Sequence, residues 1–323
     1  MRCLVHISDL HFGRTDDAVI EPLVHAISSI APDVVVVSGD LTQRARAAQF
    51  QQARRFLDRL PRPQIVVPGN HDVPLHDVLG RFLSPLTKYR RYVTADLEPF
   101  HVDDEIAVLG MNTARSLTVK GGRVNGEQLA RAHERLGALP ASVAKIIVTH
   151  HPFDLPAGHA ADDLVGGAHD AMAVFANAGA DLLLAGHLHV TRTATTAARY
   201  EIDGHAALVI QAGTATSTRV RGEVNSFNVI RIDAAGAIDA VGRRVVVERF
   251  NWDASKRAFA WASTESFTKT ARVWALATSV VTAATEGSTP PAADPPTAAP
   301  ASSAAPRAAS SEPPAPLRSR GPR

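Results

Sequence analysis

Residues 34–40 read Val-Val-Val-Val-Ser-Gly-Asp, a β-branched run that ends in a serine, a glycine and the carboxylate of Asp40. β-Branched side chains favour strands, and an uninterrupted apolar run indicates a strand that is covered on both faces. The stretch therefore predicts a buried strand in a layered α/β protein, with a polar residue at its carboxyl end.

Four other short apolar stretches end in the same way. They cover 4–8, 65–67, 145–149 and 181–185, and the polar segments after them are Asp9-Leu10-His11, Gly69-Asn70-His71-Asp72, His150-His151 and Gly186-His187-Leu188-His189. In an open α/β sheet, ligands bind beyond the carboxyl ends of the strands. We therefore expect five polar strand ends to meet at one site.

The remaining pattern supports an α/β fold in its first part and a change of pattern later. Helical spacing is found at 19–30, 45–60, 76–92, 127–136 and 171–178, and a further strand is expected at 106–111. After 185 the predicted strands 207–211, 227–232 and 244–248 follow one another without helices. Alternating elements followed by consecutive strands predict a layered core whose second half closes with antiparallel strands.

The C-terminal segment differs in composition from everything before it. Residues 283–323 consist mainly of Ala, Pro, Ser and Thr, and ten of the 21 prolines lie from Pro290 onward. Such a segment buries too little apolar surface to offset the entropy lost on ordering. We expect one catalytic domain in residues 1–282, followed by a disordered Ala/Pro/Ser-rich tail at 283–323.

Composition narrows the class of protein and its partners. The chain of 323 residues has 34 Lys+Arg against 32 Asp+Glu, and this near-even balance argues against a nucleic-acid partner. The lone Cys3 excludes an internal disulfide framework and a thiolate zinc cluster. No run of about 18 apolar residues is present, so we expect no membrane span. These features indicate a cytoplasmic protein, and a homodimer is compatible with them.

The polar residue types at the strand ends indicate a metal centre. Seven side chains are candidate ligands: Asp9, His11, Asp40, Asn70, His150, His187 and His189. Nitrogen and oxygen ligands without cysteine suit Mn, Fe or Zn. Seven ligands exceed the needs of one ion, but they fit two ions about 3.5–4 Å apart that share a carboxylate. Such pairs of ions are used for in-line displacement at phosphorus.

The five blocks together resemble a known superfamily. DLH (9–11), GD (39–40), GNHD (69–72), HH (150–151) and GHLH (186–189) are similar, in this order, to the motifs of the calcineurin-like metallophosphoesterases. SDLHFG (8–13), SGDLT (38–42) and VPGNHD (67–72) most resemble the bacterial class III cyclic-nucleotide phosphodiesterases. This resemblance implies a four-layer α/β/β/α sandwich, in which two packed mixed sheets are flanked by helices.

The resemblance also implies individual roles. One ion would be held by Asp9, His11, Asp40 and His189, and the second by Asp40, Asn70, His150 and His187, with Asp40 bridging. His71 would face the leaving-group oxygen or the phosphate, as proton donor or transition-state stabiliser. Either His150 or His151 could be the ligand, and the end of the strand at Thr149 favours His150. Asp72 is expected to orient a histidine or to cap a turn.

The expected activity is metal-dependent hydrolysis of a small-molecule phosphodiester, with a 3',5'-cyclic nucleotide such as cAMP as the leading substrate. The chain has Met111-Asn112-Thr113 where the cyclic-nucleotide members tend to carry an Asp. A glycerophosphodiester or sugar-lipid phosphate hydrolase, a DNA nuclease of the same fold and a non-enzymatic scaffold are the alternatives.

Several basic residues outside the motifs have two interpretations. The cluster of Lys88, Arg90 and Arg91 is expected on a solvated helix face, although an arginine there could contact a substrate phosphate. Arg219 and Arg221 have the same two interpretations. Histidines outside the motifs, among them His6 and His205, are expected to be ordinary surface or core residues.

Overall fold

The computed structural model describes residues 1–75, 78–116, 121–202, 204–219, 222–233 and 242–281. These residues belong to one compact unit, Met1–Thr282. The predicted tail at 283–323 lies outside the described residues, as does Arg221.

Two sheets form the centre of the fold, with the strand orders β13-β12-β11-β10-β1-β2-β3 and β4-β5-β6-β7-β9-β8. The first contains β1 (Arg2–Ile7), β2 (Val34–Val37), β3 (Gln64–Val66), β10 (Ser226–Ile232), β11 (Arg244–Asp253), β12 (Ala258–Thr270) and β13 (Val273–Val281). The second contains β4 (Phe100–Val102), β5 (Ile106–Gly110), β6 (Ala144–Val148), β7 (Leu182–Ala185), β8 (Arg192–Thr195) and β9 (Leu208–Gln211).

The apolar run at 34–37 is explained by its position between two cores. Val34 and Val36 pack into the core between the two sheets, together with residues such as Ile146 and Leu184 of the second sheet. Val35 and Val37 lie on the opposite face, in the core beneath the helices. Because successive side chains of a strand point to opposite faces, a strand in this position must be apolar at every residue.

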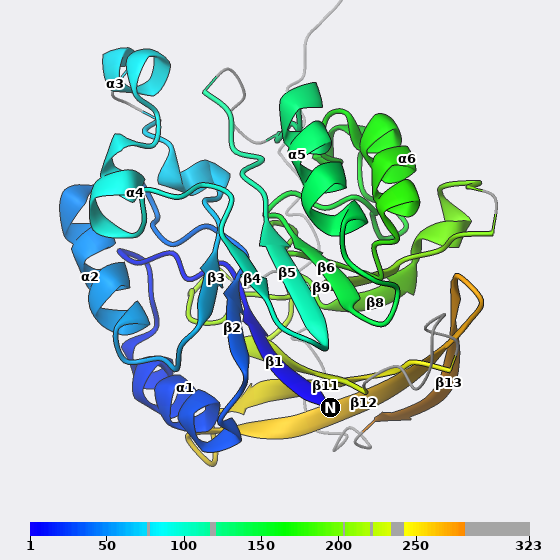
Figure 1. Ribbon diagram of the computed structural model, residues 1–323. Coiled ribbons are helices and arrows are strands. Elements are labelled where there is room, and N and C mark those ends of the chain that lie inside the picture. The colour runs from blue at the N-terminus through cyan, green and yellow to red at the C-terminus, as the bar shows by residue number, and fades with distance from the viewer. Residues whose placement is uncertain (76–77, 117–120, 203, 220–221, 234–241, 282–323) are drawn as a thin grey trace, which may run out of the picture. The chain divides into compact units, whose positions relative to one another are not determined.

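Helices flank both sheets, as Figure 1 shows, while no helix of the described residues lies over β13 and the adjoining part of β12. Apolar residues of α1 (Asp17–Ile30) and α2 (Ala47–Leu57) pack with the first sheet. Those of α5 (Gly126–Gly137) and α6 (Ala168–Ala178) pack with the second. The short helices α3 (Val78–Leu83) and α4 (Thr87–Tyr92) follow β3. The predicted four-layer α/β/β/α sandwich is therefore confirmed.

The stretch 76–92, predicted to be mostly helical, is helical over most of its described part, which forms the two short helices α3 and α4. The strand at 207–211, expected in an antiparallel second half, is β9, which pairs parallel with β7 and antiparallel with β8. The pairs β10–β11, β11–β12 and β12–β13 are antiparallel.

Four strands were not predicted: β4, β8, β12 and β13. The long β12 reads Ala-Phe-Ala-Trp-Ala-Ser-Thr-Glu-Ser-Phe-Thr-Lys-Thr, in which small and polar residues prevail, and most of its side chains are only half-buried. Without a regular apolar alternation, a strand of this kind has no clear period in its sequence. Its conformation depends on pairing with β11 on one side and β13 on the other.

Parallel pairing directs the ends of the motif strands to the same edge. The strands β1, β2 and β3 run parallel in the first sheet, and β5, β6, β7 and β9 run parallel in the second. Main-chain hydrogen bonds continue beyond these strands, from Asp9 N to Gly39 O (3.1 Å) and from Gly186 N to His150 O (3.1 Å). These bonds hold the polar segments after the strands next to one another.

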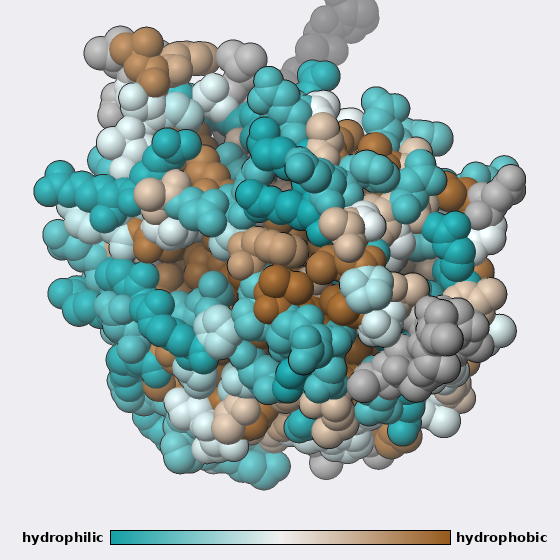
Figure 2. All heavy atoms as spheres, viewed as in Figure 1, coloured by the Kyte–Doolittle hydropathy of each residue, from teal (hydrophilic) through white to brown (hydrophobic). Residues whose placement is uncertain are grey.

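No helix in the described part of the chain has both the length and the apolar character that crossing a membrane requires. The face shown in Figure 2 is largely hydrophilic, with apolar residues in smaller patches between the polar ones.

His205 is a core residue, which is one of the two positions expected for it. It is 4% exposed, and neither ring nitrogen has a hydrogen-bond partner within the described residues. Burial, and then the positive charges of Arg272 and Lys269, lower the pKa of His205 to about 4. The ring is therefore held in its neutral form at neutral pH.

We expect the substitution His205→Leu to reduce the acid sensitivity of folding. The folded pKa lies below the ordinary value, so the stability gained from a neutral His205 is complete above about pH 6.5 and is lost as the pH falls toward 4. Between pH 7.5 and 5.0 the unsubstituted protein should lose about 2 kcal/mol more than the variant. Urea unfolding at both pH values, with a chelator present, measures the difference. Equal losses would contradict the assignment.

Candidate metal centre

The structure brings all seven predicted ligands to the carboxyl ends of the central strands. Asp9 and His11 follow β1, Asp40 follows β2, Asn70 opens the 3-10 turn Asn70–Asp72 after β3, His150 follows β6, and His187 and His189 follow β7. The two sheets therefore both contribute side chains to one site.

Four of these side chains form a first, fully buried group. Ligand atoms of Asp9, His11, Asp40 and His189 all lie within 4.8 Å of one another. His189 Nε2 is 3.1 Å from Asp9 Oδ1 and 3.2 Å from His11 Nε2. His11 Nε2 lies 3.7 Å from Asp40 Oδ2. This is the set that the resemblance assigns to one ion.

A second group surrounds the other oxygen of Asp40. His150 Nε2 lies 3.4 Å from Asp40 Oδ1 and 3.1 Å from Asn70 Oδ1. His187 Nδ1 is 3.3 Å from His150 Nε2. Since Oδ2 of Asp40 faces His11 and Oδ1 faces His150, the carboxylate stands between the two groups, as a bridging ligand would.

The contacts favour His150 over His151 as the ligand. His150 Nε2 approaches both Asp40 and Asn70, as described above. His151 also lies within reach of His150 and His187, and its ring centroid is 4.7 Å from that of His187. Its Nδ1 is engaged with Thr113 Oγ1 at 2.8 Å, which leaves Nε2 able to face the cluster. The preference for His150 therefore rests on its approach to Asp40 and Asn70, and His151 stays the alternative ligand.

Main-chain carbonyl oxygens determine which ring nitrogen faces the site. His150 Nδ1 lies 2.8 Å from Ser38 O, and His189 Nδ1 lies 2.9 Å from Arg219 O. A carbonyl oxygen can only accept, so Nδ1 carries a proton in both rings and Nε2 is the nitrogen that faces the centre, where it would offer its lone pair to a bound metal ion. Carbonyl oxygens commonly orient metal-binding histidines in this way.

Five of the seven candidate ligands have a left-handed backbone. The φ angles are 54° at Asp9, 49° at His11, 51° at Asp40, 74° at His187 and 60° at His189. Residues other than glycine rarely adopt this conformation, which costs of the order of 1–3 kcal/mol each where it is strained, and such residues cluster at functional sites. Asp and His are among the residues that tolerate it best. No pattern in the sequence had indicated this feature.

Two glycines allow the polar segments to approach closely. A Cβ at Gly69 would lie 2.1 Å from Asp40 Oδ1 and 2.3 Å from Asp40 N. A Cβ at Gly186 would lie 1.9 Å from Ser8 Oγ and 2.6 Å from Asp9 Oδ2. Neither position can accept a larger residue without moving a carboxylate of the site.

The buried carboxylates fit a cation. Asp9 and Asp40 are 0% and 1% exposed, and within the described residues Asp9 Oδ1 has the close approach of His189 Nε2 but no hydrogen bond of regular geometry. Burial alone would raise the pKa of both, yet neighbouring histidines, His189 for Asp9 and His150 for Asp40, keep both values below the ordinary one. Against its own burial, the Asp40 charge raises the pKa of His150 to about 9. The site therefore favours positive charge between its carboxylates, which metal ions would supply.

His71 is positioned beside the centre. Its N–H donates to Asp40 Oδ1 (2.8 Å), and its Nδ1 donates to Gln43 O (2.8 Å). Its Nε2 accepts from Arg219 Nη1 at 2.9 Å. Arg219 was one of the ambiguous arginines, and the structure places it at the site. By contrast, Arg90 and Arg91 are exposed on α4.

Asp72 caps a turn, one of the two roles expected for it. Its carboxylate accepts from the N–H groups of Leu41 (3.1 Å), Thr42 (2.9 Å) and Gly69 (3.0 Å). Burial, and then the nearby Asp40 charge, raise the pKa of Asp72 to about 7, while these donors act in the opposite direction. Asp72 thereby ties the segment after β2 to the segment after β3.

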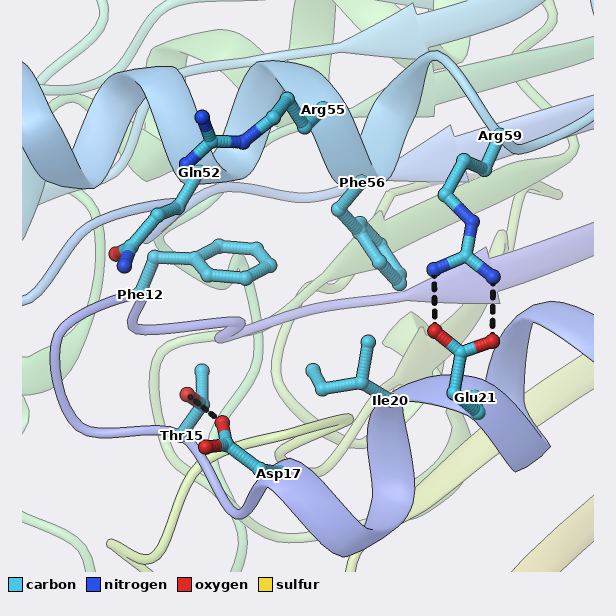
Figure 3. Close-up of a pocket in the computed structure, with 9 residues that line it drawn as sticks. All are labelled: Phe12, Thr15, Asp17, Ile20, Glu21, Gln52, Arg55, Phe56 and Arg59. Atoms are coloured by element: carbon cyan, nitrogen blue, oxygen red, sulfur yellow. Dashed lines mark hydrogen bonds and ion pairs between the residues drawn. The ribbon is translucent and has the colours of Figure 1, made fainter.

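A pocket of about 470 Å³ between α1 and α2 is separate from this centre. Figure 3 shows its walls, where Phe12, Phe56 and Ile20 face one another. Arg59 forms a bidentate ion pair with Glu21 there. None of the seven candidate ligands lines it.

The sequence is similar to those of known phosphoesterases. A family model described as calcineurin-like phosphoesterase matches residues 4–191. A probable cyclic nucleotide phosphodiesterase from Synechococcus is 26% identical over 160 residues, which are 46% of this chain and 57% of that protein. The glycerophosphodiester phosphodiesterase GpdQ from Enterobacter lignolyticus is 39% identical over 80 residues, 21% of this chain and 29% of that protein. The matches thus span about half or less of these relatives.

Solved structures share the fold. The purple acid phosphatase PPD1 from yellow lupin has a TM-score of 0.58 at 12% identity, over 84% of this chain and 54% of its own. A dimetal phosphatase from Danio rerio has a TM-score of 0.53 at 14% identity, over 76% of this chain and 95% of its own.

We expect the substitution Gly69→Ala to displace Asp40 and to reduce the metal content of the purified protein. The added Cβ meets both the side chain and the main-chain nitrogen of Asp40, so the clash cannot be relieved by a rotamer change alone. Overpacking of this kind costs about 1–3 kcal/mol of stability. Metal content by mass spectrometry and the free energy of unfolding measure the two effects.

Gly126→Ala is the matched control, because a Cβ at that position meets nothing within 4 Å. Equal metal content in the two variants would show that close approach at Gly69 is not needed for the centre.

Proposed function

Because the chain belongs to the calcineurin-like phosphoesterase family, we propose that it hydrolyses phosphodiesters at a centre of two metal ions. The observation that carries this proposal is the position of Asp40 between two groups of candidate ligands. The first ion would be held by Asp9, His11, Asp40 and His189, and the second by Asp40, Asn70, His150 and His187. Mn, Fe and Zn suit these nitrogen and oxygen ligands.

When bound, such ions neutralise phosphoryl oxygens and supply a water-derived nucleophile at neutral pH. The protein's own residues prepare the site for that chemistry. Carbonyl oxygens of Ser38 and Arg219 hold His150 and His189 in the orientation that presents Nε2. The left-handed turns keep the ligands in place before substrate binds, so little reorganisation is needed.

His71 is the proposed catalytic residue. Its Nδ1 proton is held by Gln43 O, so Nε2 is the atom that faces the substrate. In this structure Nε2 accepts from Arg219, and it would have to exchange that hydrogen bond for a proton before it could protonate the leaving-group oxygen. The hydrogen bond from its N–H to Asp40 Oδ1 fixes its distance from the centre. Asp40 thus positions the proton donor as well as the proposed metal ions.

A 3',5'-cyclic nucleotide such as cAMP is the first substrate to test. The SDLHFG, SGDLT and VPGNHD blocks and the name of the Synechococcus relative support it. Asn112, at the position where cyclic-nucleotide members tend to carry Asp, uses its Oδ1 to accept from Ala114 N (2.9 Å). Glycerophosphodiesters therefore stay in the assay and sugar-lipid phosphates stay an alternative substrate class, in line with the names of other relatives, GpdQ and the Chlamydia trachomatis pyrophosphatase LpxG. We place the reaction in the cytoplasm.

The decisive experiment assays the purified protein with Mn²⁺. The substrates are bis-p-nitrophenyl phosphate, cAMP, glycerophosphocholine and single-stranded DNA. We expect hydrolysis of small diesters and a loss of more than about 100-fold in Asp40→Ala, beyond the 10–100-fold typical of residues that only support a ligand. The reason is that one substitution removes a ligand from both groups and the anchor of His71.

Asp58→Ala is the control, because Asp58 is an exposed residue that pairs with Arg54 and Arg62. If metal is bound and no diester is cleaved, the proposed activity is wrong. Cleavage of DNA alone would instead identify a nuclease.

A further inference from the structure

A basic pocket of about 210 Å³ opens beside His71. Its lining residues are Gln43, Arg44, Asn70, His71, Val73, Leu75, Arg81 and Arg219. Asn70 and His71 belong to the site described above, so the pocket adjoins the position of the reacting phosphate. Three arginines and no acidic residue are found among these lining residues.

The three arginines come from separate segments and are held in different ways. Arg81 of α3 is 7% exposed, and its guanidinium donates to Ser116 O (2.6 Å) and Pro74 O (3.0 Å). Arg44 follows β2 and is exposed. The fold thus brings together guanidinium groups that no sequence motif connects.

Arg219 is fixed from both its main chain and its side chain. Its N–H donates to Ser217 Oγ (3.0 Å), and its carbonyl accepts from His189 Nδ1 (2.9 Å). Its Nη1 reaches His71 Nε2, the atom that would meet the leaving group. One guanidinium therefore lies directly at the boundary between the proton donor and the pocket.

We propose that this pocket binds a second anionic group, a carboxylate or a phosphate, in the leaving-group arm of the substrate. Planar guanidinium groups match the geometry of both anions and form strong charge-assisted hydrogen bonds with them. The position beside His71 places such an anion on the leaving-group side. The inference rests on the proposed diester hydrolysis, and it predicts that a diester with two negative groups is a better substrate than cAMP, which has one.

The test compares two diesters that differ in this charge, and each variant is judged by the ratio of its effects on the two, in which the different leaving-group pKa values cancel. Methyl 4-carboxyphenyl phosphate releases a phenol that bears a carboxylate, and the methyl ester of that carboxylate releases a phenol without this charge. In Arg44→Gln we expect kcat/KM for the carboxylate substrate to fall by about 10- to 100-fold, as for the loss of a charge-assisted contact, and that for the ester to fall by less than about 3-fold. Arg62→Gln, an exposed arginine that pairs with Asp58, is the matched control.

A second measurement needs no turnover. Calorimetry compares the two corresponding phosphonates, in which CH₂ replaces the leaving-group oxygen, and a third analogue with a phosphonate in the para position shows which anion binds better. The unsubstituted protein should prefer the charged analogues, and Arg44→Gln should lose that preference. Equal affinity for charged and neutral analogues, or a preference that Arg44→Gln retains, would overturn the inference. A preference without any hydrolysis would overturn the diesterase activity alone.

Discussion

The site depends on one constraint, the burial of the two carboxylates Asp9 and Asp40 beside histidine side chains. An ionised carboxylate away from water is costly unless it is paired and hydrogen-bonded. Asp9 and Asp40 are almost completely buried, and their closest titratable neighbours are imidazoles. An imidazole can supply positive charge only by taking up a proton. Metal ions would satisfy the same carboxylates with neutral histidines, so binding of cations would release protons from the site.

The sequence was sufficient to predict a layered α/β core and seven polar side chains at the ends of its strands, because both depend on local patterns. The four-layer arrangement was implied by the resemblance, and the role of the seven side chains as ligands stays a prediction. A strand buried on both faces must be apolar throughout, as at 34–37, and a polar residue directly after it has few roles other than ligand binding or turn capping. The strands β12 and β13 have no such signal. Their conformation follows from pairing with neighbours distant in sequence, and propensity alone does not reveal that dependence.

The features that refine the site were equally hidden, because they depend on the third dimension. The left-handed φ angles at Asp9 and Asp40 are imposed by main-chain bonds between neighbouring segments, such as His11 N to Asp40 O at 2.9 Å. The role of Arg219 is also long-range, since it reaches His71 across 148 positions of sequence. The sequence motifs contain the candidate ligands and His71, whereas the residues that orient them became visible only in the fold.

Arg219 shows why the metal centre and the substrate pocket should be considered together. Its carbonyl oxygen orients His189 of the first group, and its guanidinium contacts His71 beside the second. A main-chain shift at Arg219 would therefore alter a proposed metal ligand and the proton donor at once. The same guanidinium lines the pocket, so an anion bound there would contact a residue whose main-chain carbonyl is already hydrogen-bonded to His189. Under the proposed function, Arg219 would therefore contribute both to the selection of the leaving group and to the alignment of the reacting groups, which would limit how far either can change without the other.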